Sequence, residues 1–269
     1  MNFDAFREDE LNGWSARADR YNSATALATV QSIPTLLASV RLFPQARVLD
    51  AGCGPGYAAG AAAALGSVCT GIDFSPAMIS AAKKRFPAIP FSVGDVEALP
   101  VEDASQNAVV SNIVLFHLTE PANAVKEAFR VLAPDGRFAF SQWCAPAESE
   151  CYRLLFDVIS DHADLTLASP APNAFDLSDR DHARRLMEDA GFSEVSVVGV
   201  PNVLRTTAPS FYDFFMDFGV RIPLVMEKQT PSVQQKVREA IDARATHYRV
   251  DDEYRSPLPS IVVAGQRAR

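Results

Sequence analysis

The chain has 269 residues, of which 48% are hydrophobic and 22% are charged, as is ordinary for a globular protein with a sizeable core. Its formal net charge of −8 argues against binding to the phosphate backbone of nucleic acids, which needs clustered lysine and arginine. No apolar run is long enough to span a bilayer, and the acidic N-terminal stretch lacks the basic and apolar regions of a secretory signal. We therefore expect a cytoplasmic protein, a monomer or homodimer, with no nucleic-acid or membrane partner.

The first predicted element is a helix over residues 8–41, in which apolar side chains recur along one face from Leu27 to Val40. Trp14 and Tyr21 lie on the N-terminal side of this apolar stretch. A short apolar strand begins at Arg47 and ends in Asp50. The N-terminal helix is therefore expected to precede the first strand of a sheet.

Directly after Asp50 the chain carries glycines at alternate positions, Gly52, Gly54 and Gly56, followed by a small-residue helix over residues 57–65. Glycine lets the backbone approach a ligand closely and tolerates a positive φ. A strand that ends in such a loop and feeds a helix directs backbone N–H groups at one spot, which favours a bound anion. The dinucleotide fingerprint needs glycine at its sixth position, where this chain has tyrosine. The NAD form of the motif is therefore excluded.

Further strand and helix units follow at regular spacing, and each brings a carboxylate. Asp73 ends the apolar strand 68–72 and comes 23 residues after Asp50, and Asp95 comes 22 residues after Asp73. A carboxylate at the tip of the neighbouring parallel strand is placed to accept both hydroxyls of a ribose. Between the two acids, Ser75 is expected to cap a helix that opens with proline.

The rest of the chain completes the sheet. A fourth buried strand is predicted over residues 107–118, running into a loop, and a turn at residues 134–136 precedes a fifth strand. The remaining predicted elements are, in chain order, the strand 137–143, a helix over 148–164, a loop over 165–176, a helix from Ser178 to Ala190 ended by Gly191, and the strands 194–200 and 259–265.

Between the last two strands, residues 201–257 form an insertion with two helical patterns. The pattern over 210–218 is dense in aromatic residues, and the pattern over 231–248 is amphipathic. Aromatic stripes more commonly form plain core, and that alternative stays open. Five apolar strands already supply a core for the sheet, so we favour a helical substrate cap near the carboxyl ends of the strands.

The glycine loop, the two spaced acids and the fourth strand, in this order, resemble the class I methyltransferases that depend on S-adenosylmethionine (SAM). The resemblance covers Arg47–Trp143, and within the family the chain is most similar to the ubiquinone/menaquinone-type branch of small-molecule enzymes. It implies SAM as the cofactor and a Rossmann-like α/β fold in one domain over residues 1–269. The implied sheet is mostly parallel and seven-stranded with an antiparallel last strand, with helices on both faces and a helical cap insertion over 201–257.

In this family the glycine loop lies against the methionine part of SAM, the second-strand acid binds the ribose, and the third-strand acid contacts the adenine amino group. By resemblance, Asp73 takes the ribose role, Asp95 with the backbone of Val96 takes the adenine role, and the segment from Ser111 to His117 faces the methyl group. The candidate cofactor-binding residues are Asp50, Gly52, Cys53, Gly54, Gly56, Asp73, Phe74, Met78, Gly94, Asp95, Val96 and Asn112.

The resemblance also suggests which residues meet the substrate. In related small-molecule enzymes an N-terminal Trp…Tyr pair folds over the cofactor and one side of the substrate pocket, and residues 1–44 match that arrangement. Packing of both aromatic rings against the sheet is an equally open interpretation. The candidate substrate-binding residues are Trp14, Tyr21, His117, Trp143, Phe211 and Phe215.

Methyl transfer from a sulfonium chiefly needs donor and acceptor held in line, and a general base matters only when the acceptor must lose a proton. His117, just past the fourth strand, is the best placed base because the ordinary pKa of histidine lies near neutrality. Tyr21 is the second catalytic candidate, as an orienting hydroxyl. The alternative is that His117 caps the following helix and never touches the substrate.

No metal is implied, because Ser111 and Asn112 stand where the catechol-type branch has its magnesium-binding aspartate. The four cysteines show no zinc-site spacing and are expected to be reduced and apolar in role. We expect methylation of a small, largely apolar acceptor at carbon, oxygen or nitrogen, in secondary metabolism or quinone-like biosynthesis. The alternatives are a cyclase or isomerase built on the same fold, and a non-catalytic SAM-binding subunit.

Overall fold

The computed structural model describes residues 3–268 and divides into two compact units. The first unit contains the chain up to Ala28 together with Cys144–Ala171 and Pro201–Pro259. The second unit contains Thr29–Trp143, Pro172–Val200 and the chain from Ser260 onward. The glycine loop and both spaced acids therefore lie in the second unit, and the insertion that was predicted as a cap lies in the first.

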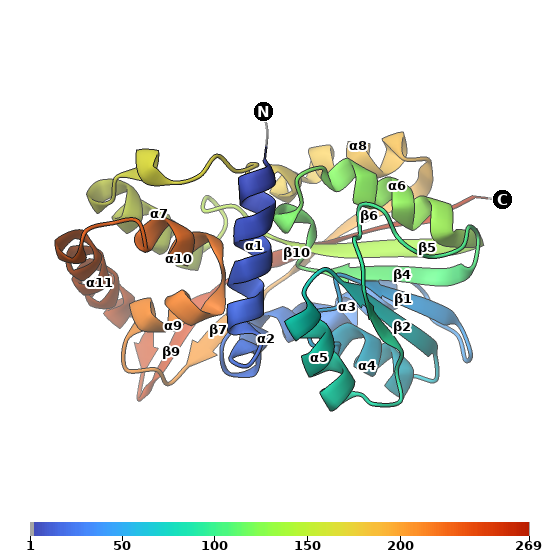
Figure 1. The fold of residues 1–269 in the computed structure, drawn as a ribbon, viewed down its shortest axis with the longest axis horizontal. Helices are drawn as coiled ribbons and strands as arrows, with labels where there is room; N and C mark the ends of the chain where they lie inside the picture. Colours follow the sequence, from blue (N-terminus) through green and yellow to red (C-terminus); the bar gives the residue numbers. More distant parts are fainter. Residues whose placement is uncertain (1–2, 269) are drawn as a thin grey trace. The chain divides into compact units, whose positions relative to one another are not determined.

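The second unit is built on a seven-stranded sheet with the order β3-β2-β1-β4-β5-β10-β6 (Figure 1). The neighbours among β1 to β5 pair in parallel, whereas β10 runs antiparallel to both β5 and β6. The mostly parallel sheet with an antiparallel last strand is thus confirmed. Its strands are β1 (Arg47–Ala51), β2 (Val68–Asp73), β3 (Phe91–Val93), β4 (Gln106–Asn112), β5 (Leu132–Trp143), β6 (Phe192–Val200) and β10 (Ser260–Arg267).

Helices cover both faces of this sheet. Figure 1 shows α3, α4 and α5 on one side and α6 and α8 on the other. The first side buries Val48, Val110 and Ala139 against α3 and α4. On the other side the ring of Phe129 lies edge-on to Phe192 at 5.1 Å. The helices are α3 (Ile33–Ser39), α4 (Tyr57–Ala64), α5 (Pro76–Arg85), α6 (Pro121–Val131) and α8 (Arg180–Asp189), with the 3₁₀ turns η2 (Val30–Ser32), η3 (Leu115–His117) and η5 (Asp176–Ser178).

The starts and ends of these helices follow the predicted signals. The Ser75 hydroxyl accepts a hydrogen bond from the Met78 N–H, with Pro76 as the first helical residue. Asp179 caps α8, and Gly191 after that helix has a φ of 100°, a left-handed conformation that glycine adopts without strain.

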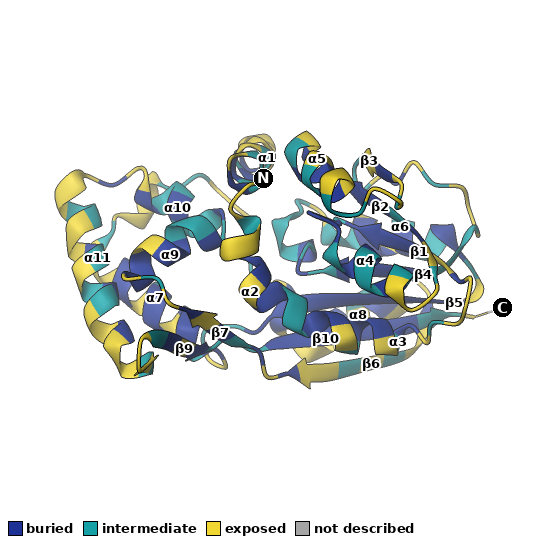
Figure 2. Ribbon diagram, turned by 90° about the horizontal axis from the view of Figure 1, so that it is seen from below, coloured by how far each residue is buried: buried dark blue, intermediate teal, exposed yellow. Residues whose placement is uncertain are grey.

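The first unit combines helices with a small three-stranded sheet of order β7-β9-β8. Figure 2 shows α9 mostly buried and α11 exposed along much of its length. The elements are α1 (Asp4–Arg17), η1 (Tyr21–Ser23), α2 (Ala26–Thr29, at the boundary between the units), α7 (Glu150–His162), η4 (Leu165–Leu167), β7 (Val203–Thr206), α9 (Phe211–Phe218), α10 (Arg221–Met226), α11 (Pro231–Ala245), η6 (Thr246–Tyr248), β8 (Arg249–Val250) and β9 (Glu253–Pro257).

One sequence prediction about these elements was wrong, and one feature was not predicted. The single helix over 8–41 is instead broken into α1, η1, α2, η2 and α3. One cause is Pro34, which has no N–H to continue a helix and is accommodated in the first turn of α3. The small sheet was missed because its strands are two to five residues long and rich in charged side chains, without the alternation that marks a half-buried strand. None of the helices among the described residues is both long and apolar enough to cross a membrane.

Candidate cofactor site

The candidate site lies where the chain order of the sheet reverses. Strand β1 pairs with β2 on one side and with β4 on the other. In open α/β sheets, ligands bind at such a switch point, beyond the carboxyl ends of the strands. The glycine loop follows β1 at this edge, Asp73 ends β2, and Asn112 ends β4. The fold therefore brings the predicted cofactor residues of the second unit to one edge of one sheet.

The glycine loop adopts a conformation that other residues disfavour. Gly52, Gly54 and Gly56 have φ values of 75°, 48° and 84°. The N–H groups of Gly52 and Cys53 both donate to the Ile72 carbonyl, at 2.8 and 2.9 Å, which ties the loop to β2. A Cβ on Gly52 would lie 2.5 Å from a methyl carbon of Val114, whereas a Cβ on Gly54 would meet no atom within 4 Å. Gly52 is thus required by the protein's own packing, and the backbone at Gly54 is open to a ligand.

Asp73 connects the glycine loop to the start of α5. Its Oδ2 accepts a hydrogen bond from the Gly54 N–H at 2.8 Å, and its Oδ1 accepts one from the Ser75 N–H at 2.9 Å. The side chain is buried, and this burial raises its pKa to about 6, against the opposing effects of the two N–H donors and of the charge of His117. An ionised carboxylate has about four acceptor positions. Two therefore remain for the hydroxyls of a ribose.

Asp50 holds the start of the helix α4, which follows the glycine loop. It is 1% exposed, and its Oδ2 accepts a hydrogen bond from the Ala59 N–H in the first turn of α4 at 2.8 Å. Burial raises its pKa to about 7, with the Ala59 N–H lowering the pKa and the negative charge of Asp73 raising it further. The carboxylate thus holds the start of α4. Direct contact between Asp50 and the cofactor stays a prediction.

The third predicted acid, Asp95, lies in the connection between β3 and β4. The Gly94 N–H donates to the Asp73 carbonyl at 3.0 Å, so this connection begins beside the ribose candidate. Asp95 is half-buried, and its Oδ1 accepts a hydrogen bond from the Glu97 N–H at 2.9 Å. Val96 is 7% exposed. The two adenine candidates are therefore adjacent to the acid that was predicted to bind the ribose.

The segment after β4 is held in a strained conformation. Ile113 has a φ of 59°, which is unusual for a β-branched residue. Its N–H donates to the Ser141 hydroxyl, and that hydroxyl donates to Asn112 Oδ1 at 2.7 Å. The Asn112 amide in turn donates to the Thr29 carbonyl at 3.0 Å. Both ends of the Asn112 side chain thus hold the segment in place, and contact between Asn112 and the cofactor stays a prediction.

His117 ends the 3₁₀ turn η3 that follows this segment. Its ring is half-buried and lies 3.7 Å, centroid to centroid, from the ring of Phe116. Its charge acts on Asp73, so the imidazole lies within electrostatic reach of the glycine loop. The structure thus brings His117 to the same edge of the sheet as the cofactor candidates. Whether it serves as a base stays a prediction.

The other predicted side chains have different surroundings. Met78 and Cys53 are 2% and 7% exposed in the second unit, and Trp143 is 2% exposed at the end of β5. Phe74 is half-buried immediately after Asp73. All four cysteines of the chain are free and buried, as predicted.

The candidates in the first unit form two groups. Trp14 and Tyr21 are half-buried, with ring centroids 6.0 Å apart. Phe211 and Phe215 are 0% and 2% exposed, and their rings lie 5.1 Å apart. The aromatic stripe of α9 therefore forms core within its own unit, the alternative that the sequence left open, and contact of these two rings with a substrate stays a prediction.

Sequence reasoning missed the residues that support the site. Ser141 fixes Asn112 and Ile113, and Val114 packs against Gly52. The polar Ser141, directly after the apolar residues Phe138–Phe140 of β5, is a signal that could have been used, because a buried hydroxyl needs a hydrogen-bond partner. Nothing in the local sequence indicates that Val114 would lie against the glycine loop.

Comparison with known proteins supports the same interpretation of the fold. Residues 49–140 match the family described as "Methyltransferase domain". The chain is 30% identical to a malonyl-[acyl-carrier protein] O-methyltransferase of Erwinia billingiae over 59% of its own length and 60% of that protein. It is 29% identical to the demethylmenaquinone methyltransferase of Renibacterium salmoninarum over 59% of its own length and 71% of that protein. Two further curated relatives are matched over only 37% and 40% of their length.

A solved structure agrees with the topology. A putative methyltransferase from Bacillus halodurans superposes with a TM-score of 0.58 at 19% identity, covering 88% of this chain and 99% of that one. At this identity the likeness concerns the fold alone. The family match shows a methyltransferase domain over residues 49–140, and the strand order with the solved structure shows the class I methyltransferase fold around it.

Proposed function

We propose that this protein transfers the methyl group of SAM to a small, largely apolar acceptor. The observation that carries the proposal is the junction of Gly54 and Asp73. There the backbone is open on one side, and on the other it donates to a carboxylate that can accept further hydrogen bonds. This combination suits a ligand with a ribose and a charged amino-acid end. SAM belongs to that class.

When bound, SAM supplies a methyl group on a sulfonium, which is already activated for transfer. The residues of the chain then have to bind and orient. The open backbone at Gly54 accommodates the amino-acid end, Asp73 accepts hydrogen bonds from the ribose hydroxyls, and Asp95 accepts one from the adenine amino group. Holding donor and acceptor in line can supply about 7–11 kcal/mol of the barrier to transfer. His117 would hold the proton of an acceptor that must lose one.

The relatives do not agree on an acceptor. One is named for malonyl-[acyl-carrier protein] and another for demethylmenaquinone, a carboxyl acceptor and a quinone-type ring respectively. We favour a ring-type apolar acceptor, in quinone-like or secondary metabolism, because the motifs over Arg47–Trp143 resemble the quinone-type branch, although the malonyl-[acyl-carrier protein] relatives are matched at similar identity. Carbon, oxygen and nitrogen remain open as the atom that is methylated.

The proposal is tested with SAM that carries a labelled methyl group. The purified chain is incubated with a reduced naphthoquinone, a catechol and a malonyl thioester in parallel, and labelled product and S-adenosylhomocysteine are quantified. We expect label in one of the two ring acceptors and an equal amount of S-adenosylhomocysteine. Label only in the malonyl product would overturn the acceptor class. Bound SAM with no S-adenosylhomocysteine from any candidate acceptor, together with conversion of a ligand to an isomer, would contradict the transferase function and favour the cyclase alternative.

A further inference from the structure

The connection between β3 and β4, residues 94–105, contains Asp95 and Val96, the two proposed adenine contacts. It consists of turns and one isolated bridge between Asp95 and Ala98, with no helix or longer strand among its residues. A segment of this kind is not held by a regular backbone ladder. Its conformation therefore depends on side chains that reach it from elsewhere.

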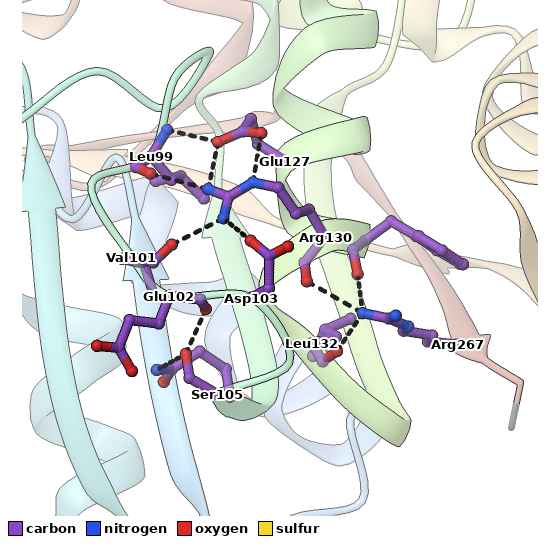
Figure 3. Close-up of polar contacts among 11 residues, drawn as sticks. Leu99, Val101, Glu102, Asp103, Ser105, Glu127, Arg130, Leu132 and Arg267 are labelled. Atoms are coloured by element: carbon purple, nitrogen blue, oxygen red, sulfur yellow. Dashed lines mark hydrogen bonds and ion pairs between the residues drawn. The ribbon is translucent and has the colours of Figure 1, made fainter.

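Arg130, in the last turn of α6, makes most of those contacts (Figure 3). Its Nη2 donates to the Leu99 carbonyl at 2.9 Å, and its Nη1 donates to the Val101 carbonyl at 2.8 Å and to the Asp103 carboxylate. The two remaining N–H groups donate to Glu127 at 2.7 and 2.8 Å. All five donors of the guanidinium are thus used, and three of them go to the connection.

Glu127 completes the arrangement. One of its oxygens accepts from the Leu99 N–H at 2.7 Å while the carboxylate also receives the paired N–H groups of Arg130. The hydrogen bond from Arg130 lowers the pKa of Glu127, so the carboxylate is ionised at neutral pH. Both polar groups of the Leu99 backbone are therefore bound by one ion pair from α6.

The same helix holds the connection at a second point. At the other end of α6, the Glu97 carboxylate accepts a hydrogen bond from the Glu120 N–H at 2.7 Å, where the helix begins. Asp95 and Val96 lie between Gly94, which is bonded to Asp73, and the two points that α6 fixes. Contacts with the helix α6 thus fix where the adenine candidates lie relative to the ribose candidate.

We propose that Arg130 and Glu127 are positioning residues that hold Asp95 and Val96 at the adenine ring of SAM. The inference rests on the proposed adenine role of Asp95. A ligand binds more tightly when the loop that contacts it is already ordered, because less conformational entropy is lost on binding. Lysine would substitute only in part, since it is a single point donor without the fixed fork of a guanidinium.

The test compares two ligands that differ only at the adenine amino group, S-adenosylhomocysteine and S-inosylhomocysteine. Calorimetry gives the dissociation constant of each, and their ratio measures recognition of the amino group. For Arg130→Met we expect weaker binding of S-adenosylhomocysteine and a ratio reduced by about tenfold, the scale of one hydrogen bond to a charged group. A purely structural role would lower thermal stability and leave this ratio unchanged in the folded protein.

Arg267 provides a matched control in the same region (Figure 3). Its guanidinium is also half-buried and also binds the end of α6, donating to the carbonyls of Phe129, Arg130 and Leu132. None of these acceptors lies in the connection. Arg267→Met should therefore lower thermal stability to a similar extent as Arg130→Met and keep the wild-type ratio.

Three more variants keep the outcome decisive. If Arg130→Met does not fold, Arg130→Lys and Glu127→Gln make the same measurement with smaller expected losses of the ratio. If Asp95→Ala leaves the ratio unchanged, the adenine role itself is wrong. If Asp95→Ala lowers the ratio while the folded Arg130 and Glu127 variants keep it, only the positioning role is overturned.

Discussion

The polar residues proposed to bind the cofactor also make hydrogen bonds within the protein itself. Asp73 was expected to bind a ribose, and in the structure its two oxygens already hold the glycine loop and the start of α5. Asn112 was expected to bind the cofactor, and in the structure its amide also joins Thr29 to Ser141. A polar residue at the end of a strand thus reveals a site, but its immediate partners depend on segments distant in the sequence.

His117 carries the first prediction. The His117→Ala variant should bind S-adenosylhomocysteine as the wild type does, because the glycine loop and Asp73 remain. If the imidazole is the base, turnover should fall by at least about tenfold, and by up to the roughly 10²–10⁴-fold that general bases typically contribute. Steady-state rates at saturating SAM provide the measurement. Wild-type turnover would assign His117 a structural role.

At the scale of elements, the strands and helices of the second unit were predicted from the sequence more completely than those of the first. Parallel strands buried on both faces give continuous apolar runs, and the glycine and acid signals mark where each strand ends. The elements of the first unit were predicted less well, because its helices and short strands depend on packing against each other more than on local sequence signals. The aromatic stripe of α9 is an example, because a helix that lines core and one that lines a pocket have the same sequence pattern.

The glycine loop gives a prediction at this scale. Gly52→Ala should destabilise the fold, because its Cβ would lie 2.5 Å from Val114 in addition to the left-handed backbone. Gly54→Ala has only the backbone cost of about 1–2 kcal/mol, since a Cβ there meets no atom within 4 Å. Its larger effect should be on SAM affinity. Urea unfolding and calorimetry separate the two, and equal stability losses with equal affinities would show that the loop does not face the cofactor.

For the whole molecule, the two buried carboxyl groups make stability depend on pH. Burial raises the pKa of Asp50 to about 7 and that of Asp73 to about 6, above the ordinary value of 3.8. A raised pKa in the folded state means that the folded protein binds more protons than the unfolded chain. The contribution of Asp50 and Asp73 to the free energy of unfolding is therefore fully present below pH 3.8. It is lost as the pH rises through 6 and 7.

The corresponding prediction concerns the ligand-free protein. Between pH 5.5 and pH 8 the contribution of Asp50 to the free energy of unfolding should fall, and Asp50→Asn, which keeps an acceptor for the Ala59 N–H, should be less affected. Urea unfolding of both proteins at the two pH values measures the difference. The hypothesis fails if the free energy of unfolding changes equally between the two pH values in the variant and in the wild type.

The central claim is that SAM binds at the glycine loop with its ribose on Asp73. Calorimetric titration of the wild type and of Asp73→Ala with S-adenosylhomocysteine tests this directly. We predict one bound ligand per wild-type chain and binding weaker by about 1.5–3 kcal/mol in the variant, the scale of hydrogen bonds to a charged group. Equal affinities in the two proteins, or no binding to the wild type, would contradict the account.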